Sequence, residues 1–305
     1  MAVEWFREHT LYGTSRVMLD KAMAVAVEYE DQGLKLTLRQ LYYQMVARGF
    51  IENKLREYKK LGRVITNARE AGMMSWDIIE DLGRKSTHPY VRQTQTGAMH
   101  GLEYALQLDR WQPLDHYVEV WVEKQALQSI VARACKPLYT PYMACKGYLS
   151  ASEAYLAGKR FEAAIARGKE PVLIHLGDHD PSGINMTSDN RDRLRLFARD
   201  HSIQVKRIAL NMDQVEEYNP PPNPAKETDS RFQAYQDQFG DSSWELDALP
   251  PDVLDTIIGD SIEPFIDRDV WEELDDREDE LREPLIAVRE NWEEVKDLME
   301  EAGLI

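Results

Sequence analysis

Two apolar, β-branched segments that each end on carboxylates constrain the fold of this chain most. The first covers residues 118–122 (VEVWV) and is followed by Glu123. The second covers residues 171–176 (PVLIHL) and is followed by Gly177-Asp178-His179-Asp180. Because the carboxyl ends of strands in an open α/β sheet converge on one crevice, we expect Glu123, Asp178 and Asp180 to meet there.

Three carboxylates in one crevice repel one another unless a hard cation lies among them. Oxygen ligands suit Mg²⁺, which commonly binds through one or two carboxylates and a substrate phosphate. The pattern therefore predicts a Mg²⁺ site that faces a phosphate-bearing substrate. Two alternatives stay open: the aspartates simply end a strand in a turn, or His175 and His179 recruit a transition metal. A mid-strand imidazole such as that of His175 is more commonly buried and hydrogen-bonded.

From Tyr117 onward, strand and helix patterns alternate, which indicates an α/β fold with a parallel sheet and helices on its faces. We expect strands at 117–122, 139–143, 171–177 and 203–210, and helices at 125–134, 150–167 and 184–199. The proline-rich residues 219–224 predict a linker or loop.

The residues before this region predict helices. The first covers 15–32 and stops at Gly33, the second opens at Thr37 with Gln40 completing a capping box, and the third covers about 53–70. The short apolar segment 73–81 is expected to form a hairpin or wing. Helices with a small hairpin favour a winged-helix domain that contacts DNA, and a plain three-helix bundle is the alternative.

The charge of the chain is unevenly distributed. The net charge of −17 argues against nucleic acid, but 13 basic and 8 acidic residues lie between Lys35 and Arg110. By contrast, 23 acidic and 5 basic residues lie between Asp241 and Ile305. The basic part is compatible with phosphate contact. We expect the DNA-contacting side chains to be Lys59, Lys60, Arg63, Lys124 and Lys146.

The acidic tail has a helical apolar spacing from Trp271 to Met299 that is interrupted by Glu278. Pro284 is expected to kink or divide this helix. We favour a helix that packs on its own domain over a dimer-forming coiled coil, because the heptad pattern is short.

Tyr43 is a candidate nucleophile. On the helix that opens at Thr37, the apolar stripe includes Tyr42, whereas Tyr43 is about 100° away from it and one turn after Arg39. A phenol beside a guanidinium is suited to form a phenolate that attacks phosphorus. The alternative is an exposed tyrosine with a cation–π neighbour.

These motifs together resemble the A subunit of DNA topoisomerase VI and the related meiotic double-strand-break protein. The resemblance rests on Arg39-x-x-Tyr42-Tyr43, Val122-Glu123-Lys124-x-Ala126, Cys145-Lys146-Gly147-Tyr148 and Gly177-Asp178-x-Asp180-Pro181-x-Gly183. The stretch 244–249 also resembles the segment that follows the Toprim domain of these subunits. After Gly147-Tyr148 the chain departs from the family pattern, with Leu149, Ser150 and Glu153 at positions where the family often has proline and Thr-Arg. The compact, stand-alone Mini-A proteins of phages and mobile elements are the most similar members.

The resemblance implies a winged-helix domain (1–112) with the nucleophile Tyr43 and Arg39, a Toprim domain (113–218) that binds Mg²⁺ through Glu123, Asp178 and Asp180, and an acidic helical extension (219–305). It implies a homodimer that cleaves double-stranded DNA by tyrosine transesterification, with tyrosine and metal contributed by different protomers. The sequence leaves open whether an ATPase B-type subunit acts in trans. The alternatives are a Toprim endonuclease that uses water and a non-catalytic DNA-binding module. With two cysteines and no long apolar segment, we expect a cytoplasmic, nucleoid-associated protein without a membrane segment.

Overall fold

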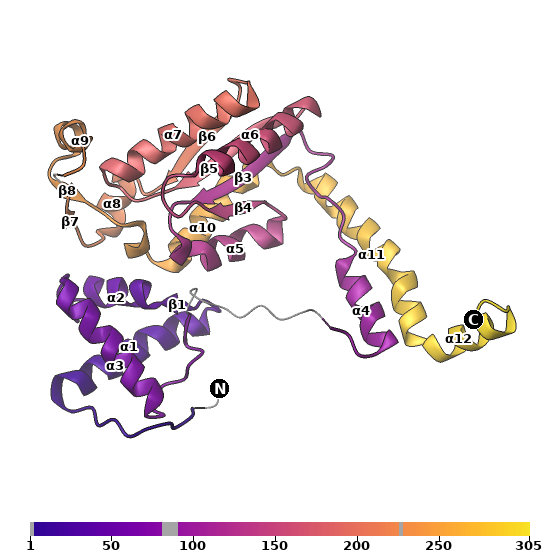
Figure 1. Ribbon diagram of the computed structural model, residues 1–305, viewed down its shortest axis with the longest axis horizontal. Helices are drawn as coiled ribbons and strands as arrows, with labels where there is room; N and C mark the ends of the chain where they lie inside the picture. Colours follow the sequence, from indigo (N-terminus) through magenta and orange to yellow (C-terminus); the bar gives the residue numbers. More distant parts are fainter. Residues whose placement is uncertain (1–2, 81–90, 226–227) are drawn as a thin grey trace. The chain divides into compact units, whose positions relative to one another are not determined.

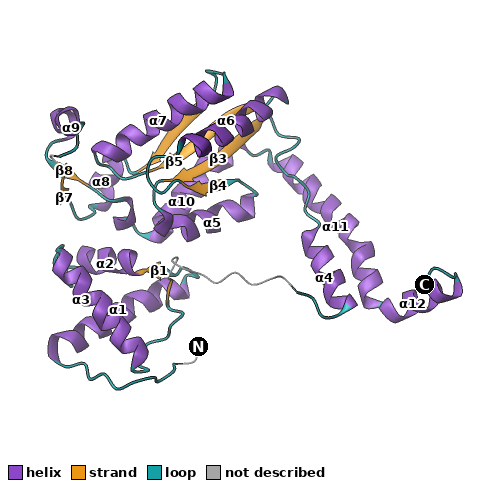
Figure 2. Ribbon diagram, viewed as in Figure 1, coloured by secondary structure: helices purple, strands orange, loops and turns teal. Residues whose placement is uncertain are grey.

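The structure is a computed structural model that describes residues 3–80, 91–225 and 228–305. The chain forms two compact units: Met1–Arg84 with His116–Pro264, and Lys85–Asp115 with Phe265–Ile305. The first unit combines helices with a parallel β-sheet, as expected for an α/β protein (Figure 2). The domain limits drawn from the sequence, at residues 112 and 218, stay predictions.

Three helices begin the first unit: α1 (Gly13–Asp31), α2 (Leu38–Ala47) and α3 (Leu55–Glu70). Their apolar side chains share one core, as the sequence pattern requires. The predicted capping box is confirmed, because the Gln40 backbone N–H donates to the Thr37 hydroxyl (3.3 Å) and the Thr37 N–H donates to the Gln40 side chain (2.7 Å). Gly33, with φ +72°, follows the first helix in the left-handed region that favours glycine.

The predicted hairpin at 73–81 is wrong over the described residues 73–80. Strand β2 (Ile79–Glu80) pairs in parallel with β1 (Leu36–Thr37), so its backbone partner lies far back in the chain and not in an adjacent strand. Residue 81 lies outside the described residues. The three-helix core is compatible with both fold alternatives, and the winged-helix assignment therefore stays a prediction.

The central sheet contains four parallel strands in the order β4-β3-β5-β6. These strands are β3 (His116–Val122), β4 (Tyr142–Ala144), β5 (Glu170–Leu176) and β6 (Gln204–Ala209), which confirms the four predicted strands with small shifts at their ends. In the register of the sheet, Val122 lies beside Ala144 and Leu176, and Leu176 lies beside Ala209. All four strands thus end at the same edge of the sheet.

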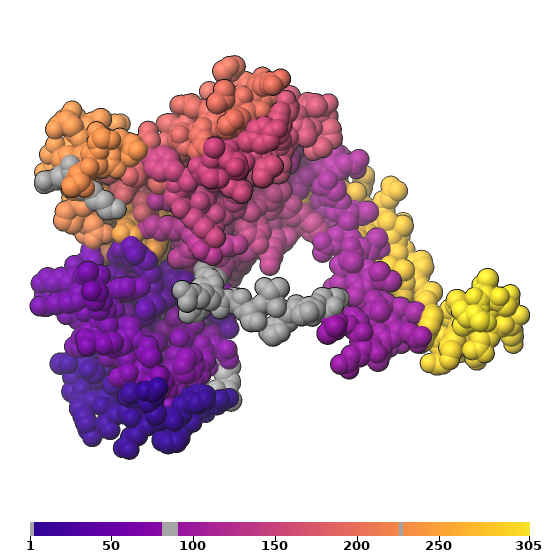
Figure 3. Space-filling view, in the orientation of Figure 1, coloured from indigo at the N-terminus to yellow at the C-terminus, as the bar shows by residue number. Residues whose placement is uncertain are grey.

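Helices cover both faces of this sheet (Figure 1). On one face α6 (Ala151–Ala166) packs against α7 (Pro181–Ala198) over a core that includes Trp121 and Phe161. Figure 3 shows the outer surface of this part of the chain in pink and salmon. On the other face α5 (Gln128–Cys135) packs against α10 (Pro251–Ile262). Short 3₁₀ segments flank α5, η1 (Gln125–Leu127) before it and η2 (Lys136–Leu138) after it.

Between β6 and α10 the chain forms several short elements. They are α8 (Met212–Tyr218), β7 (Asn223–Pro224), α9 (Phe232–Phe239), β8 (Ser242–Ser243) and the 3₁₀ segment η3 (Leu246–Ala248). The predicted loop at 219–224 is irregular up to residue 222. Its last two residues pair with β8 in a two-stranded antiparallel sheet, which has no central strand and therefore tolerates Pro224.

The second unit consists mainly of helices: α4 (Gln95–Ala105), α11 (Arg268–Glu290) and α12 (Trp292–Glu301), with the 3₁₀ segment η4 (Glu263–Phe265) at its boundary. Helix α11 packs against α4 of the same unit, a helix that the sequence places in the N-terminal domain, and the choice between a tail packed on its own domain and a dimer-forming coiled coil stays a prediction. It continues through Pro284 and ends before Asn291, so the expected division at Pro284 is wrong. No helix in the described ranges has the length and apolar character needed to cross a bilayer.

Glu278 interrupts the apolar spacing of α11 for a structural reason. Its side chain is 3 % exposed, and it accepts a hydrogen bond from the Leu108 backbone N–H at 2.8 Å. It also pairs with Arg110 at 3.3 Å and with Arg282. A buried carboxylate with these partners joins α11 to the segment after α4.

Candidate metal centre

The carboxyl end of the sheet positions Glu123 and Asp178 side by side. The Glu123 backbone N–H donates to the Leu176 carbonyl (2.8 Å), and the Asp178 N–H donates to Glu123 Oε2 (2.9 Å). Asp180 follows as the N-cap of α7, where its Oδ1 accepts from the Gly183 N–H at 2.6 Å. One oxygen of Asp180 therefore has the structural role that the alternative to a metal site predicts, because it caps a helix.

Two glycines permit this close packing. A Cβ atom on Gly177 would lie 3.0 Å from Glu123 Oε2, and one on Gly183 would lie 2.2 Å from the Asp178 carbonyl oxygen. Arg207 of β6 stabilises the same loop, because its guanidinium donates to the carbonyls of Gly177 (2.8 Å) and Asp178 (2.7 Å). The spacing Gly-Asp-x-Asp-x-x-Gly thus has a steric basis.

The structure adds two carboxylates that sequence reasoning did not select. Asp178, Glu245 and Asp247 each offer an oxygen atom, and these atoms lie within 4.8 Å of one another. The segment around η3 is held here because the Leu246 N–H donates to Asp178 Oδ1 at 2.8 Å. The repeated acidic-x-acidic pattern of Glu245-Leu246-Asp247, like that of Asp178 and Asp180, was the signal available in the sequence.

All five carboxylates line one hollow of about 590 Å³. The hollow thus contains the three predicted metal ligands, Glu123, Asp178 and Asp180, together with Glu245 and Asp247. Predicted cationic residues Arg39, Lys124 and Lys146 line the same hollow. Gln125, Ala126 and Tyr148 also line it.

Lys124 and Arg39 are ion-paired within this cluster. Lys124 Nζ lies 2.8 Å from Asp178 Oδ2 and 3.2 Å from Asp247 Oδ1, and it also contacts Glu245. Arg39 Nε lies 2.8 Å from Asp247 Oδ2, and its guanidinium contacts Glu245. Arg39, on α2, therefore joins the helical part of the unit to the segment after β8.

Burial shifts the protonation of the cluster. It raises the pKa of Asp178 to about 7, because the neighbouring Glu123, Asp247 and Glu245 reinforce the desolvation that Lys124 opposes. Burial also raises the pKa of Glu123, against the hydrogen bond from Asp178. For Lys124, burial alone would lower the pKa, but Asp178, Asp247 and Glu245 together raise it. The lysine is therefore a permanent cation in this cluster.

The predicted exposure of Tyr43 is wrong. Its side chain is 4 % exposed, as buried as Tyr42 at 5 %. Burial and the Glu245 carboxylate raise the pKa of Tyr43 to about 12, while Arg39, Asn223 and Lys124 oppose that shift. The Arg39 guanidinium lies 5.7 Å from the ring centre, so the expected pairing is present, but it does not by itself favour a phenolate.

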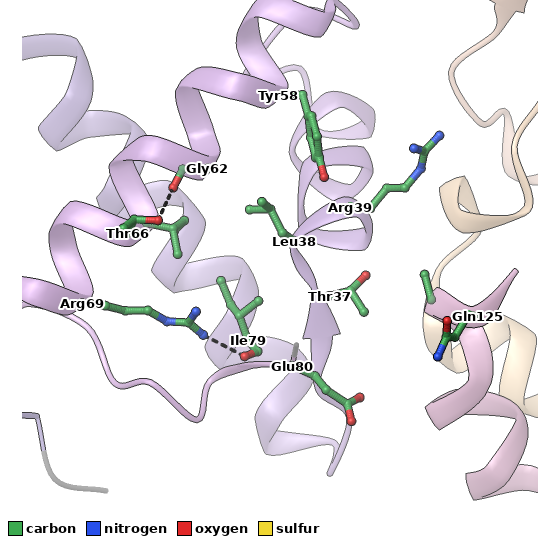
Figure 4. A pocket seen from close by; sticks show the side chains of 12 residues that line it. Thr37, Leu38, Arg39, Tyr58, Gly62, Thr66, Arg69, Ile79, Glu80 and Gln125 are labelled. Carbon is green, nitrogen blue, oxygen red and sulfur yellow. Dashed lines mark hydrogen bonds between the residues drawn. The ribbon is translucent and has the colours of Figure 1, made fainter. Parts of the chain in front are cut away.

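A second hollow of about 510 Å³ adjoins the first, since Arg39, Gln125 and Ala126 line both. Figure 4 shows Arg39 and Gln125 on separate segments that border it, with Thr66 and Arg69 of α3 farther along the wall. Of the predicted DNA contacts on α3, Lys59 and Arg63 are exposed and Lys60 is half-buried, with its Nζ near Thr14 Oγ1 (3.3 Å). None of these three lines either hollow.

His175, His179 and the two cysteines are buried and have structural environments. His175 is fully buried, with Nδ1 2.9 Å from Thr187 Oγ1, and burial lowers its pKa to about 3. His179 Nδ1 lies 2.7 Å from the Tyr235 hydroxyl, and burial lowers its pKa to about 4. Cys135 and Cys145 are free and buried. These contacts favour the buried, hydrogen-bonded imidazole predicted for His175 over a transition-metal site, and His179 has a similar environment.

The donor set of the hollow fits a hard divalent cation, because every candidate ligand is a carboxylate oxygen. Asp247 adds a specific observation: its carboxylate is fully buried, yet neither oxygen accepts a hydrogen bond. The chain matches no protein-family model, no curated protein and no solved structure.

Proposed function

We propose that this protein is a Mg²⁺-dependent DNA-cleaving enzyme of the type IIB topoisomerase A-subunit kind, with Tyr43 as the nucleophile. The observation that carries the proposal is the hollow at the sheet edge. There Glu123, Asp178 and Asp180 lie in one cavity with Arg39, whose helix also bears Tyr43. The winged-helix and Toprim assignments, which rest on the resemblance of the motifs, belong to this proposal.

In this mechanism Glu123, Asp178 and Asp180 would hold Mg²⁺. The bound ion would orient a backbone phosphate and neutralise the charge that develops on its oxygens. Arg39 and Lys124 act on the nucleophile, because their positive charges lower the pKa of Tyr43 against the effect of burial.

The chemical step is a transesterification. The Tyr43 oxygen forms a bond to phosphorus, the bond from phosphorus to the 3′ oxygen breaks, and the phenol proton is balanced by protonation of that 3′ oxygen. The products are a 5′-phosphotyrosyl bond and a free 3′ hydroxyl, with no water consumed. Cleavage of both strands requires two such sites, which a two-fold symmetric homodimer provides.

A second candidate is a nuclease that uses the same carboxylates with water as nucleophile. The burial of Tyr43, at 4 % exposure, and its pKa near 12 favour this alternative, because a buried neutral phenol is a poor nucleophile. Tyr43 would then have only a packing role. The two functions share the metal and differ in the fate of the tyrosine.

Covalent trapping distinguishes the two candidates. Wild-type protein is incubated with end-labelled duplex DNA and Mg²⁺, denatured, and analysed without protease treatment. Transesterification leaves labelled DNA attached to protein, and mass spectrometry locates a nucleotide on Tyr43. Cut DNA with a free 5′ phosphate and unmodified Tyr43 would establish the nuclease instead.

A mixing experiment tests whether protomers share the site. Tyr43→Phe and Asp178→Asn are each expected to be inactive alone. If tyrosine and metal ligands come from different protomers, mixed dimers contain one complete site and recover single-strand cleavage. If both come from one chain, as the contacts of Arg39 with Glu245 and Asp247 allow, mixtures stay inactive.

A further inference from the structure

The ammonium group of Lys124 lies at the centre of a carboxylate cluster that differs from the predicted metal ligands. Its Nζ contacts all three residues of the group: Asp178 at 2.8 Å, Asp247 at 3.2 Å, and Glu245. The oxygen atoms of these residues lie within 4.8 Å of one another. A cation of the chain itself therefore lies among oxygens that are close enough together to share one ion.

Asp247 provides an independent sign that this cluster is built for a ligand. Its side chain is 0 % exposed, and neither carboxylate oxygen accepts a hydrogen bond. Arg39 Nε and Lys124 Nζ lie at ion-pair distances of 2.8 and 3.2 Å, but their N–H groups are not aligned with the oxygens. Buried carboxylates are normally hydrogen-bonded, so this one has lone pairs available to a cation.

The backbone keeps part of the cluster in place. Asp178 Oδ1 accepts the hydrogen bond from the Leu246 N–H at 2.8 Å. The other oxygen, Oδ2, lies beside Lys124 and is the atom available to bind a cation. Glu245 and Asp247 flank that same Leu246 in sequence. The Leu246 contact, together with the two backbone hydrogen bonds between His179 and Trp244, aligns three carboxylates from two distant segments of the chain.

Negative charge exceeds positive charge in the hollow. Five carboxylates line it, whereas only Arg39, Lys124 and Lys146 among its lining residues are cationic. Replacement of one ammonium charge by a divalent ion would bring the hollow closer to neutrality. Mg²⁺ and Mn²⁺ both accept all-oxygen ligand sets of this kind.

We propose that Asp178, Glu245 and Asp247 form a divalent-cation site, and that the Lys124 ammonium is the counter-ion that the incoming cation displaces. The inference deepens the metal requirement of the proposed function and rests on it for any role in DNA cleavage. Binding of the cation itself needs no DNA. Asp178 belongs to both ligand sets, whereas Glu245 and Asp247 belong only to this one.

Mn²⁺ binding to the full-length protein without DNA tests the proposal, measured by calorimetry and by the loss of the free-ion electron paramagnetic resonance signal. Glu245→Gln and Asp247→Asn are each expected to weaken this binding at least tenfold. Glu162→Gln, a half-exposed carboxylate paired with Lys159 and outside both ligand sets, is the control and is expected to keep the affinity within about threefold. Wild-type affinity in both Glu245→Gln and Asp247→Asn would overturn the proposal.

Lys124 variants test the displacement. Lys124→Gln removes the competing ammonium, so Mn²⁺ should bind at least threefold more tightly, whereas Lys124→Arg keeps a cation and should not gain affinity. Weaker or equal binding in Lys124→Gln would contradict the counter-ion role. If that variant does not fold, nitrogen-15 resonances of wild-type lysines serve instead. The Lys124 Nζ signal, assigned with Lys124→Arg, must then move on addition of Mg²⁺, and a fixed signal refutes displacement.

These outcomes are separable from those of the proposed function. Mn²⁺ binding that depends on Glu245 and Asp247, in a protein that never cuts DNA, supports the cation site and refutes the enzyme. DNA cleavage together with Mn²⁺ binding that ignores both residues supports the enzyme and refutes the site.

Discussion

Removal of one oxygen atom from Tyr43 is the most informative perturbation of this protein. Tyr43→Phe keeps the ring in the core and its contact with Arg39, but it removes a buried hydroxyl that interacts with the Asn223 side chain. Loss of one polar interaction of this kind in a buried position costs about 0.5–1.5 kcal/mol of unfolding free energy. For a chain of this size that corresponds to a shift of roughly 2–4 °C or less in Tm.

Tyr42→Phe is the matched control for stability. The Tyr42 hydroxyl donates to Asn53 Oδ1 at 3.0 Å, and its side chain is 5 % exposed, so its loss should cost a similar amount. Urea unfolding therefore should not separate the two variants. Covalent DNA adducts should separate them, because the Arg39 guanidinium lies over the Tyr43 ring and Glu245 and Lys124 act on the Tyr43 hydroxyl.

The expected result is complete loss of adducts in Tyr43→Phe and near wild-type adduct formation in Tyr42→Phe. Adducts that persist in Tyr43→Phe would refute the assignment of the nucleophile. Adducts that disappear in both variants, with both proteins folded, would indicate that the packing of the tyrosine pair matters and not the Tyr43 oxygen.

Three further predictions concern stability. Burial raises the folded-state pKa of Asp178 to about 7, above its unfolded value, so the stability of the metal-free protein should fall as pH rises toward and through 7. Between pH 5 and 7 the wild type should lose about 2 kcal/mol of unfolding free energy relative to Asp178→Asn in urea titrations. Parallel pH curves for the two proteins would disprove this. Gly183→Ala places a Cβ atom 2.2 Å from the Asp178 carbonyl oxygen, so it should lower the unfolding free energy by about 1–3 kcal/mol and weaken Mn²⁺ binding. The control Gly259→Ala, whose Cβ atom would have nothing within 4 Å, should be neutral or stabilising. Equal unfolding midpoints for the two variants would contradict the steric argument. Glu278→Gln, which removes a charge paired with Arg110 and Arg282, should destabilise the second unit by about 1–3 kcal/mol in thermal unfolding, and an unchanged Tm would show that the pairing contributes nothing.

The sequence by itself determined the features that depend on local pattern. β-branched runs predicted the four strands, and their parallel register brought Glu123 and Asp178 to one edge. The capping box at Thr37 and the stop at Gly33 also came from neighbouring residues alone. These predictions held because hydrogen bonds within a few residues, together with a simple alternation of strands and helices, decide them.

Only the tertiary structure decided the environment of Tyr43 and the membership of the carboxylate cluster. A helical stripe assumes one buried face, but α2 packs against α1 on one side and against η3 on another, so a residue 100° away from the stripe is buried as well. Glu245 and Asp247 reach Asp178 through hydrogen bonds between two distant segments: the Leu246 N–H donates to Asp178 Oδ1, 68 positions away, and His179 and Trp244 exchange two backbone hydrogen bonds. Contacts of that range depend on how whole segments pack, and local sequence pattern carries no information about them.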